Sequence, residues 1–221
     1  MKTLIIIPAY NEQDNLDSLI KDVTSYNYDY LVINDCSKDK TAEILDNNKY
    51  NHLDLPINVG IAGVTQIGFK YAYEHDYDCV VNIDGDGQHQ PKYVNTLISE
   101  IEKGYDYVVG SRFVLEKKPL SLRMLGSRII CFIIRLKTGK TVSDPTSGMR
   151  ALGKKVIEKF SKSMNFYAEP DALSFLLKKG CKVKEVQVEM KDREGGVSYF
   201  HNPLKSIYYM LAIIISILFA Q

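Results

Sequence analysis

The sequence lacks the cysteine pattern of a secreted or zinc-binding protein. Its four cysteines lie dozens of residues apart and form no CxxC pair: Cys36, Cys79, Cys131 and Cys181. A disulfide framework or a cysteine zinc site is therefore not expected, and a reducing cytoplasm fits best. The formal net charge of +1 also gives no indication of a nucleic-acid partner.

Two further features are missing. The first apolar run, residues 4–7, is not followed by Gly-x-Gly-x-x-Gly, which argues against NAD or FAD binding. No apolar run has the length of about 20 residues that spans a bilayer, since the uncharged C-terminal segment 206–221 has only 16. Tyr208 and Tyr209 near its start favour a membrane interface. We expect residues 201–221 to form a membrane-associated tail; a C-terminal core helix is the alternative.

What the sequence does contain is an alternation of apolar runs and helical patterns. Strands are expected at 4–7, 30–33, 79–83, 107–109 and 183–188, and helices near 15–23, from 39, and at 63–73, 93–102 and 168–179. Nearly continuous apolar strands between helices predict an α/β fold with a mostly parallel central sheet covered on both faces. No linker interrupts residues 1–200, so we expect one domain there. Ligands of such sheets bind at the carboxyl ends of the strands.

The clearest chemical motif follows the apolar run 79–83. It reads Asp84-Gly85-Asp86-Gly87-Gln88-His89. Mg²⁺ and Mn²⁺ prefer oxygen ligands, and proteins often hold them by one or two carboxylates together with substrate phosphates. An acidic turn is the alternative. An EF-hand is excluded, because Asn95 stands where the twelfth-position glutamate would be.

Polar residues also follow the other expected strands. Residues 8–12, Pro-Ala-Tyr-Asn-Glu, can form a lip for base stacking or only a turn. Asp35 is a candidate ligand of a nucleobase or ribose, whereas Ser37 or Asp39 is expected to cap the next helix.

Basic residues gather between 112 and 140. Eight lysines and arginines (112, 117, 118, 123, 128, 135, 137 and 140) accompany one acid, Glu116. Aliphatic residues between them predict an interfacial helix on anionic lipid; a solvated charged face is the alternative. Aliphatic side chains offer little for base stacking, which again argues against nucleic acid.

Two later segments carry weaker signals. Residues 144–150, Asp-Pro-Thr-Ser-Gly-Met-Arg, could hold an acceptor, or Asp144 could act as a base. Arg193 and the glycine pair after it lie where a loop could clamp a diphosphate, although a Gly-Gly pair is more often a turn.

Taken in order, these motifs resemble family 2 glycosyltransferases with a GT-A fold, and more narrowly polyprenyl-phosphate glycosyltransferases of the dolichyl-phosphate mannosyltransferase type. The resemblance covers about residues 4–198. It rests on IPAYNE (7–12), NDCSKDKT (34–41), NVGIAGVTQIGFKYA (58–72), DGDGQHQP (84–91), GSR (110–112), DPTSGMRA (144–151) and REGGVS (193–198).

The resemblance implies a role for each matching residue. For the nucleotide sugar these residues are Pro8, Tyr10, Glu12, Asp35, Asp84, Gln88 and Arg193. Arg112, Arg123 and Ser127 match positions that hold the lipid phosphate, and Asp84 and Asp86 match the metal site. We expect Asp86, Asp144 and Arg112 to take part in catalysis. One departure is Cys36, which stands where the family usually has glycine and so questions the local turn.

The implied reaction is inverting transfer of a hexose from a UDP- or GDP-sugar to a polyprenyl phosphate, with Mg²⁺ or Mn²⁺, at the cytoplasmic face of the cell membrane. The product would serve cell-envelope glycan modification. A lipid phosphate is already ionised and needs no strong base, whereas a sugar acceptor, the first alternative, would give Asp144 that role. The second alternative is a non-catalytic nucleotide-sugar-binding subunit. The tail would also allow the protein to bind a membrane partner or to form a homo-oligomer.

Overall fold

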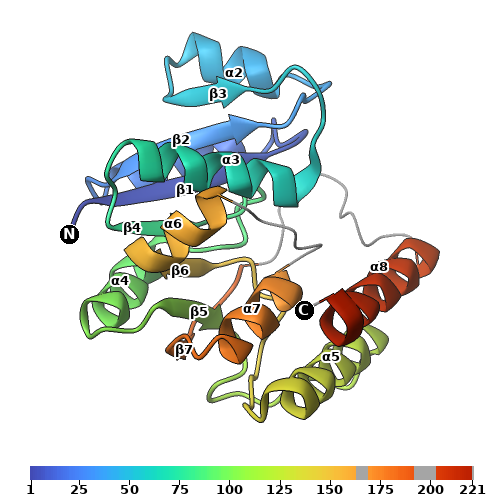
Figure 1. Ribbon diagram of the computed structural model, residues 1–221. Helices are drawn as coiled ribbons and strands as arrows, with labels where there is room; N and C mark the ends of the chain where they lie inside the picture. Colours follow the sequence, from blue (N-terminus) through green and yellow to red (C-terminus); the bar gives the residue numbers. More distant parts are fainter. Residues whose placement is uncertain (163–168, 192–202, 221) are drawn as a thin grey trace.

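The computed structural model describes residues 1–162, 169–191 and 203–220, and these form an α/β structure around one sheet (Figure 1). The strands lie in the order β3-β2-β1-β4-β6-β5-β7. Their bounds are β1 (Thr3–Ala9), β2 (Asp29–Asn34), β3 (His52–Asp54), β4 (Cys79–Asn82), β5 (Tyr107–Ser111), β6 (Arg150–Gly153) and β7 (Val183–Gln187). Only β6 pairs antiparallel in this sheet, with β4 and β5. The expected mostly parallel sheet is confirmed.

Helices cover both faces of the sheet. They are α1 (Leu16–Thr24), α2 (Thr41–Asn47), α3 (Gly60–Glu74), α4 (Val94–Glu102), α5 (Leu122–Thr138), α6 (Lys154–Lys162), α7 (Glu169–Lys178) and α8 (Pro203–Ile215). A 3-10 turn, η1 (Pro91–Tyr93), precedes α4, and a π-helical turn, η3 (Ser216–Ala220), follows α8.

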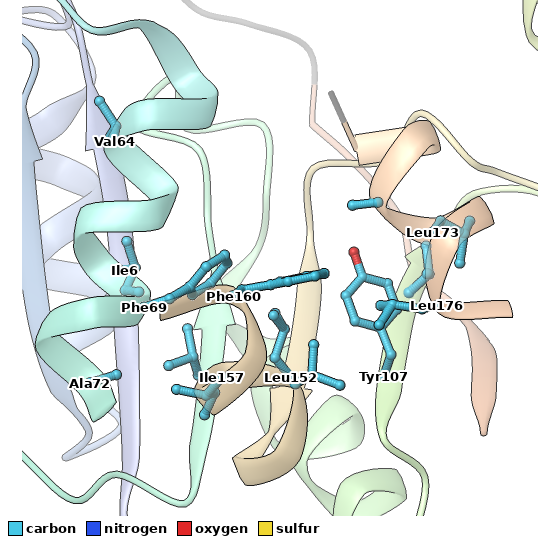
Figure 2. Packing of buried hydrophobic residues seen from close by; sticks show 14 of the residues in the cluster. Ile6, Val64, Phe69, Ala72, Tyr107, Leu152, Ile157, Phe160, Leu173 and Leu176 are labelled. Carbon is cyan, nitrogen blue, oxygen red and sulfur yellow. The ribbon is translucent and has the colours of Figure 1, made fainter. Parts of the chain in front are cut away.

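The two faces of β1 contribute to two separate hydrophobic cores, because successive residues of a strand point to opposite faces of the sheet. Ile6 packs with Phe69 of α3 and Phe160 of α6 in the larger core, which Figure 2 shows from close by. Ile5 packs with Leu16 of α1 in the smaller one. Burial on both faces explains why β1 reads as a continuous apolar run rather than an alternating one.

Helix α5 has clear end signals in the sequence. Ser121 at its N-cap accepts a hydrogen bond from the Met124 N–H at 3.3 Å. Gly139 ends it with φ of 71°, a left-handed conformation that glycine adopts without strain. The predicted basic, apolar segment is therefore a single capped helix of 17 residues.

Three elements were absent from the sequence prediction: β3, β6 and α6. The strand β6 has only four residues and begins with Arg150, which is 1% exposed, so it shows no apolar alternation. Helix α6 is mostly charged, and only Val156, Ile157 and Phe160 face the core.

The C-terminal tail packs against the domain more closely than expected. Ile213 and Ile217 are fully buried in the larger core. Ser216 donates to Asp171 Oδ2 at 2.6 Å, and Lys137 of α5 donates to the Leu218 carbonyl oxygen at 2.7 Å. In the part of the chain that the structure describes, none of the helices combines the length and apolar character needed to cross a bilayer.

Candidate active site

The loops after β1 and β2 interlock at the carboxyl edge of the sheet. The N–H groups of Asn11 and Glu12 donate to Ser37 Oγ and Thr41 Oγ1, both at 2.9 Å. In the reverse direction, the Lys38 N–H donates to Asn11 Oδ1 at 2.8 Å. These reciprocal bonds join the predicted donor motifs 7–12 and 34–41 into one unit. Pro8 is buried there, whereas Tyr10 is 43% exposed.

The N-cap of α2 is Lys40 rather than Ser37 or Asp39, the two expected residues, and Asp39 lies one residue before it. Its Oδ1 accepts from the Thr41 N–H at 2.9 Å and its Oδ2 from the Gln13 N–H at 3.2 Å. Burial tends to raise the pKa of the Asp39 carboxyl, but the hydrogen bonds from Thr41 and Gln13 outweigh it, so this pKa lies below its ordinary value.

Cys36 lies in a turn that needs a left-handed backbone conformation. Cys36 has φ of 59°, in the left-handed region that favours glycine. Its neighbour Asp35 is 4% exposed and accepts hydrogen bonds from the N–H groups of Val59 and Gly60 at 2.7 and 2.9 Å. Asp35 thus orders the start of α3, a structural role that the sequence did not predict and that stands beside its expected ligand role.

The motif Asp84 to His89 turns sharply after β4. A side chain at Gly85 would come within 2.7 Å of the Pro8 carbonyl oxygen, so glycine is required for this close approach. The buried His89 accepts from the Asp84 N–H at Nδ1, at 3.0 Å. A ring nitrogen that accepts carries no proton, so the 3.6 Å contact from this nitrogen to Asp84 Oδ2 is no ion pair in that state.

The same turn contacts the segment after β7. The Lys191 N–H donates to the Gln88 carbonyl oxygen at 3.0 Å, and Gln88 Nε2 donates to the Lys191 carbonyl oxygen at 3.2 Å. The predicted clamp residue Arg193 lies outside the described residues. The described chain before Arg193 ends at Lys191, which contacts Gln88.

The expected metal ligands are the carboxylates of Asp84 and Asp86. Asp84 and Asp86 are separated by one residue, Gly85, after the end of β4, and Asp86 Oδ1 accepts from the Gln88 N–H at 3.1 Å. Within the described ranges, no group of three or more His, Cys, Asp or Glu side chains is arranged to hold a metal ion. Two carboxylates completed by a diphosphate would suffice for Mg²⁺ or Mn²⁺, so the residues fit the expected mode of binding.

Arg112, directly after β5, forms an ion pair with Asp144, in the loop before β6. Arg112 donates from Nε to Asp144 Oδ2 at 2.7 Å and from an Nη to Oδ1 at 2.9 Å. The Asp144 side chain is fully buried, and that of Arg112 is 21% exposed. Such bidentate pairs fix orientation as well as charge. Asp144 therefore orients Arg112, and its carboxylate is engaged rather than open as a base.

Two residues of β7 that the sequence analysis missed position this pair. Glu185 accepts from the N–H groups of Ser143 and Asp144 at 2.7 and 2.8 Å. Gln187 accepts from the Val114 N–H at 3.0 Å and donates to the Arg112 carbonyl oxygen at 2.9 Å. Alternation along β7, which puts residues 185 and 187 on one face, is the only sequence signal for them.

The motif that begins at Asp84 and the loop that contains Asp144 meet at Gly148. A Cβ atom there would overlap the Asp84 carboxylate, so any other residue at position 148 would displace that carboxylate from its present position. Gly148 lies four residues after Asp144 on the same loop, whose Ser147 donates to the Gly110 carbonyl oxygen at 2.5 Å. The structure thus brings the Asp84 motif and the Arg112–Asp144 pair to one edge of the sheet.

The expected lipid-phosphate residues are described in part. Ser127 is buried on α5 and accepts a hydrogen bond from Lys118 Nζ at 2.8 Å. Arg123 lies in the first turn of α5, and its side chain is outside the described part of the structure.

Similar proteins place this arrangement in a family. The model for "Glycosyl transferase family 2" matches residues 4–161. The UDP-N-acetylglucosamine–dolichyl-phosphate N-acetylglucosaminyltransferase of Methanococcus voltae is 32% identical over 183 residues, 72% of each chain. The polyprenol monophosphomannose synthase of Mycolicibacterium smegmatis is 28% identical, over 89% of this chain and 80% of that protein.

A solved structure shows the same fold at lower identity. Glucosyl-3-phosphoglycerate synthase from Mycobacterium tuberculosis, in complex with Mn²⁺, uridine-diphosphate and phosphoglyceric acid, has a TM-score of 0.72 and 17% identity. The match covers 98% of this chain and 77% of that one. With a GT-A-like α/β fold and a family model that matches well over half of its length, the chain belongs to glycosyl transferase family 2.

Proposed function

We propose that this protein transfers a hexose from a nucleotide diphosphate sugar, UDP- or GDP-linked, to a polyprenyl phosphate, with inversion at the anomeric carbon. The proposal is based on one observation: the acidic turn at Asp84 and the loop that carries the Arg112–Asp144 ion pair meet at Gly148. The first suits a metal-bound diphosphate and the second an anionic acceptor. The relatives from Methanococcus voltae and Mycolicibacterium smegmatis, named for dolichyl-phosphate and polyprenol transfer, support the lipid acceptor.

On the donor side, the interlocked loops 7–12 and 34–41 would hold the nucleotide. Asp84 and Asp86 would hold Mg²⁺ or Mn²⁺, which neutralises the departing diphosphate when bound. Both carboxylates stand on a turn fixed by Gly85 and His89, so they need little rearrangement when the donor binds.

On the acceptor side, Arg112 would orient the lipid phosphate, and its own orientation is fixed by Asp144. A phosphate monoester is already ionised near neutral pH, since its second pKa is about 6. The chain then has to position the acceptor and balance its charge rather than remove a proton. This is the reason that an engaged Asp144 favours a lipid phosphate over a sugar hydroxyl as acceptor.

We also propose that α5 and α8 hold the protein at the cytoplasmic face of the membrane. Each helix has an exposed apolar stripe at helical spacing: Leu125, Ile129, Phe132 and Leu136 on α5, and Tyr208, Leu211 and Ile215 on α8, which Phe219 of η3 extends. The two helices lie side by side (Figure 1). Arg128, Arg135 and Lys137 add positive charge to α5, which suits anionic lipid.

Exposed positions give the cleaner test of this attachment, because deleting the tail would also remove Ile213 and Ile217 from the core. We expect the double variant Phe132→Ser/Leu136→Ser to lose co-sedimentation with vesicles that contain anionic lipid. Ile57→Ser, at a residue 65% exposed outside the two helices, is the matched control. Equal vesicle binding by the double variant and the control would rule out α5 as the docking surface.

The transfer reaction is tested by incubating the purified full chain with labelled UDP- and GDP-sugars, Mn²⁺ and undecaprenyl phosphate, followed by lipid extraction. The proposal expects label in the lipid fraction that is released by mild acid, as a glycosyl phosphate should be. Label found only on an added sugar acceptor would establish the alternative glycosyltransferase. Donor binding with no transfer to either acceptor would favour the non-catalytic subunit.

A further inference from the structure

The segment 112–121, between β5 and α5, is held against α5 by two basic side chains. Arg128 donates to the carbonyl oxygens of Lys118 and Pro119 at 2.8 and 3.3 Å. Lys118 in turn donates from Nζ to Ser127 Oγ at 2.8 Å and to Cys131 Sγ at 3.2 Å. The Lys118 ammonium group is thus fixed beside Ser127, one of the residues expected at the acceptor phosphate.

The hydrogen-bond partners of Lys118 do not balance its charge. In the described part of the chain, no carboxylate forms a salt bridge within 4 Å of its Nζ. Burial raises the pKa of the Cys131 thiol, and the charges of Glu185 and Asp144 add to this, whereas the charge of Lys118 opposes it. The thiol is therefore protonated at neutral pH, and both partners of the ammonium group are neutral.

Arg112 differs from Lys118 in this respect. Both cations lie near the ring of Phe113, with Arg112 Cζ 5.1 Å and Lys118 Nζ 5.5 Å from its centroid. The charge of Arg112 is matched by the buried carboxylate of Asp144. Among the described residues, Lys118 is therefore the one of these two cations that has no carboxylate in direct contact, and it is the one that can pair directly with an incoming anion.

We propose that Lys118 binds the phosphate group of the acceptor, together with Ser127. This assignment rests on the proposed transfer to a polyprenyl phosphate. Exchanging the neutral thiol of Cys131, a weak acceptor, for an anionic phosphate oxygen converts this contact of the ammonium group into an ion pair that is also hydrogen-bonded. The contact with Ser127 orients the ammonium group before the phosphate arrives.

Binding measurements test this without depending on turnover. The full chain in detergent is titrated calorimetrically with farnesyl phosphate, as wild type, Lys118→Met, Lys118→Arg and Lys117→Met. Lys117 is the matched control, because it is an exposed lysine next to Lys118 in the same segment. We expect Lys118→Met to weaken binding by roughly tenfold or more, as for loss of a charge-assisted bond, and Lys117→Met by less than about twofold.

The conservative variant separates charge from packing. Lys118→Arg keeps the positive charge and should recover most of the lost affinity, whereas recovery no better than in Lys118→Met would assign Lys118 a packing role and overturn the proposal. Equal affinities in Lys118→Met and Lys117→Met would overturn it too. If farnesyl phosphate binds through Lys118 but labelled sugar never reaches undecaprenyl phosphate, the phosphate site stands and the proposed reaction fails.

Discussion

The proposed donor side and the proposed acceptor side of the sheet edge are positioned by different kinds of contact. The donor loops 7–12 and 34–41 hold each other, through bonds such as Glu12 to Thr41. The acceptor segments around Arg112 and Asp144 are held from outside by Glu185 and Gln187 of β7. The two donor loops hold each other directly, although the neighbouring turn at Gln88 also contacts Lys191. The acceptor segments, in contrast, depend on a strand about 40 to 75 residues farther along.

The largest expected effect tests the donor side alone. Asp86→Ala should reduce the rate of sugar transfer by about a thousandfold or more, because a metal that stabilises the leaving group contributes several kcal/mol. The melting temperature should change little, since Asp86 lies on a strand-end turn outside both hydrophobic cores. Steady-state kinetics with and without EDTA measure this effect. Full activity in EDTA would show that no metal takes part.

The next effect concerns the stability of the acceptor side. Asp144→Asn removes the carboxylate from a bidentate pair and leaves Arg112 without its partner, at a cost of about 3 kcal/mol in the free energy of unfolding. Thermal unfolding should show a loss of several degrees in melting temperature. Glu116→Gln, an exposed position in the adjoining segment, is the control. Similar melting temperatures for both variants would mean that the ion pair contributes little.

Arg112→Ala and Arg123→Ala probe acceptor binding. Each should raise KM for polyprenyl phosphate by roughly tenfold to a hundredfold, as for a lost charge-assisted hydrogen bond. KM for the nucleotide sugar should change far less, because the donor loops are held independently. An equal rise in both KM values would move these arginines to the diphosphate.

The smallest effect lies away from the site, at the amino end of the sheet. Tyr77 donates to Asp29 Oδ2 at 2.9 Å, and burial, with help from Asp29, raises the pKa of Tyr77 to about 12. A raised pKa stabilises the fold fully below the ordinary tyrosine value near 10, and this stability is lost as the pH rises toward 12. Between pH 9 and 12, the free energy of unfolding measured with urea should decrease more steeply with rising pH for the wild type than for Tyr77→Phe. Parallel curves would contradict this assignment.

The same contrast explains what the sequence could predict. The strands β1, β2 and β4 and their terminal motifs were predicted because apolar runs and polar strand ends are contiguous. The strand β6 was missed because it begins with the buried Arg150, whose donors reach the carbonyl oxygens of Ser147 and Pro145. Glu185 and Gln187 were missed because their partners are distant in sequence. The tail was predicted as separate, since an uncharged run does not reveal that Ile213 and Ile217 are buried.

The central claim, that donor and acceptor are bound by separately organised sides, is tested most directly by equilibrium binding of UDP and GDP in the presence of Mn²⁺. Wild type, Asp86→Ala and Arg112→Ala are compared in the same titration. We expect Asp86→Ala to lose affinity for the nucleotide that wild type prefers, and Arg112→Ala to bind it within about twofold of wild type. Loss of nucleotide affinity in both variants, to a similar degree, would contradict the division of the site.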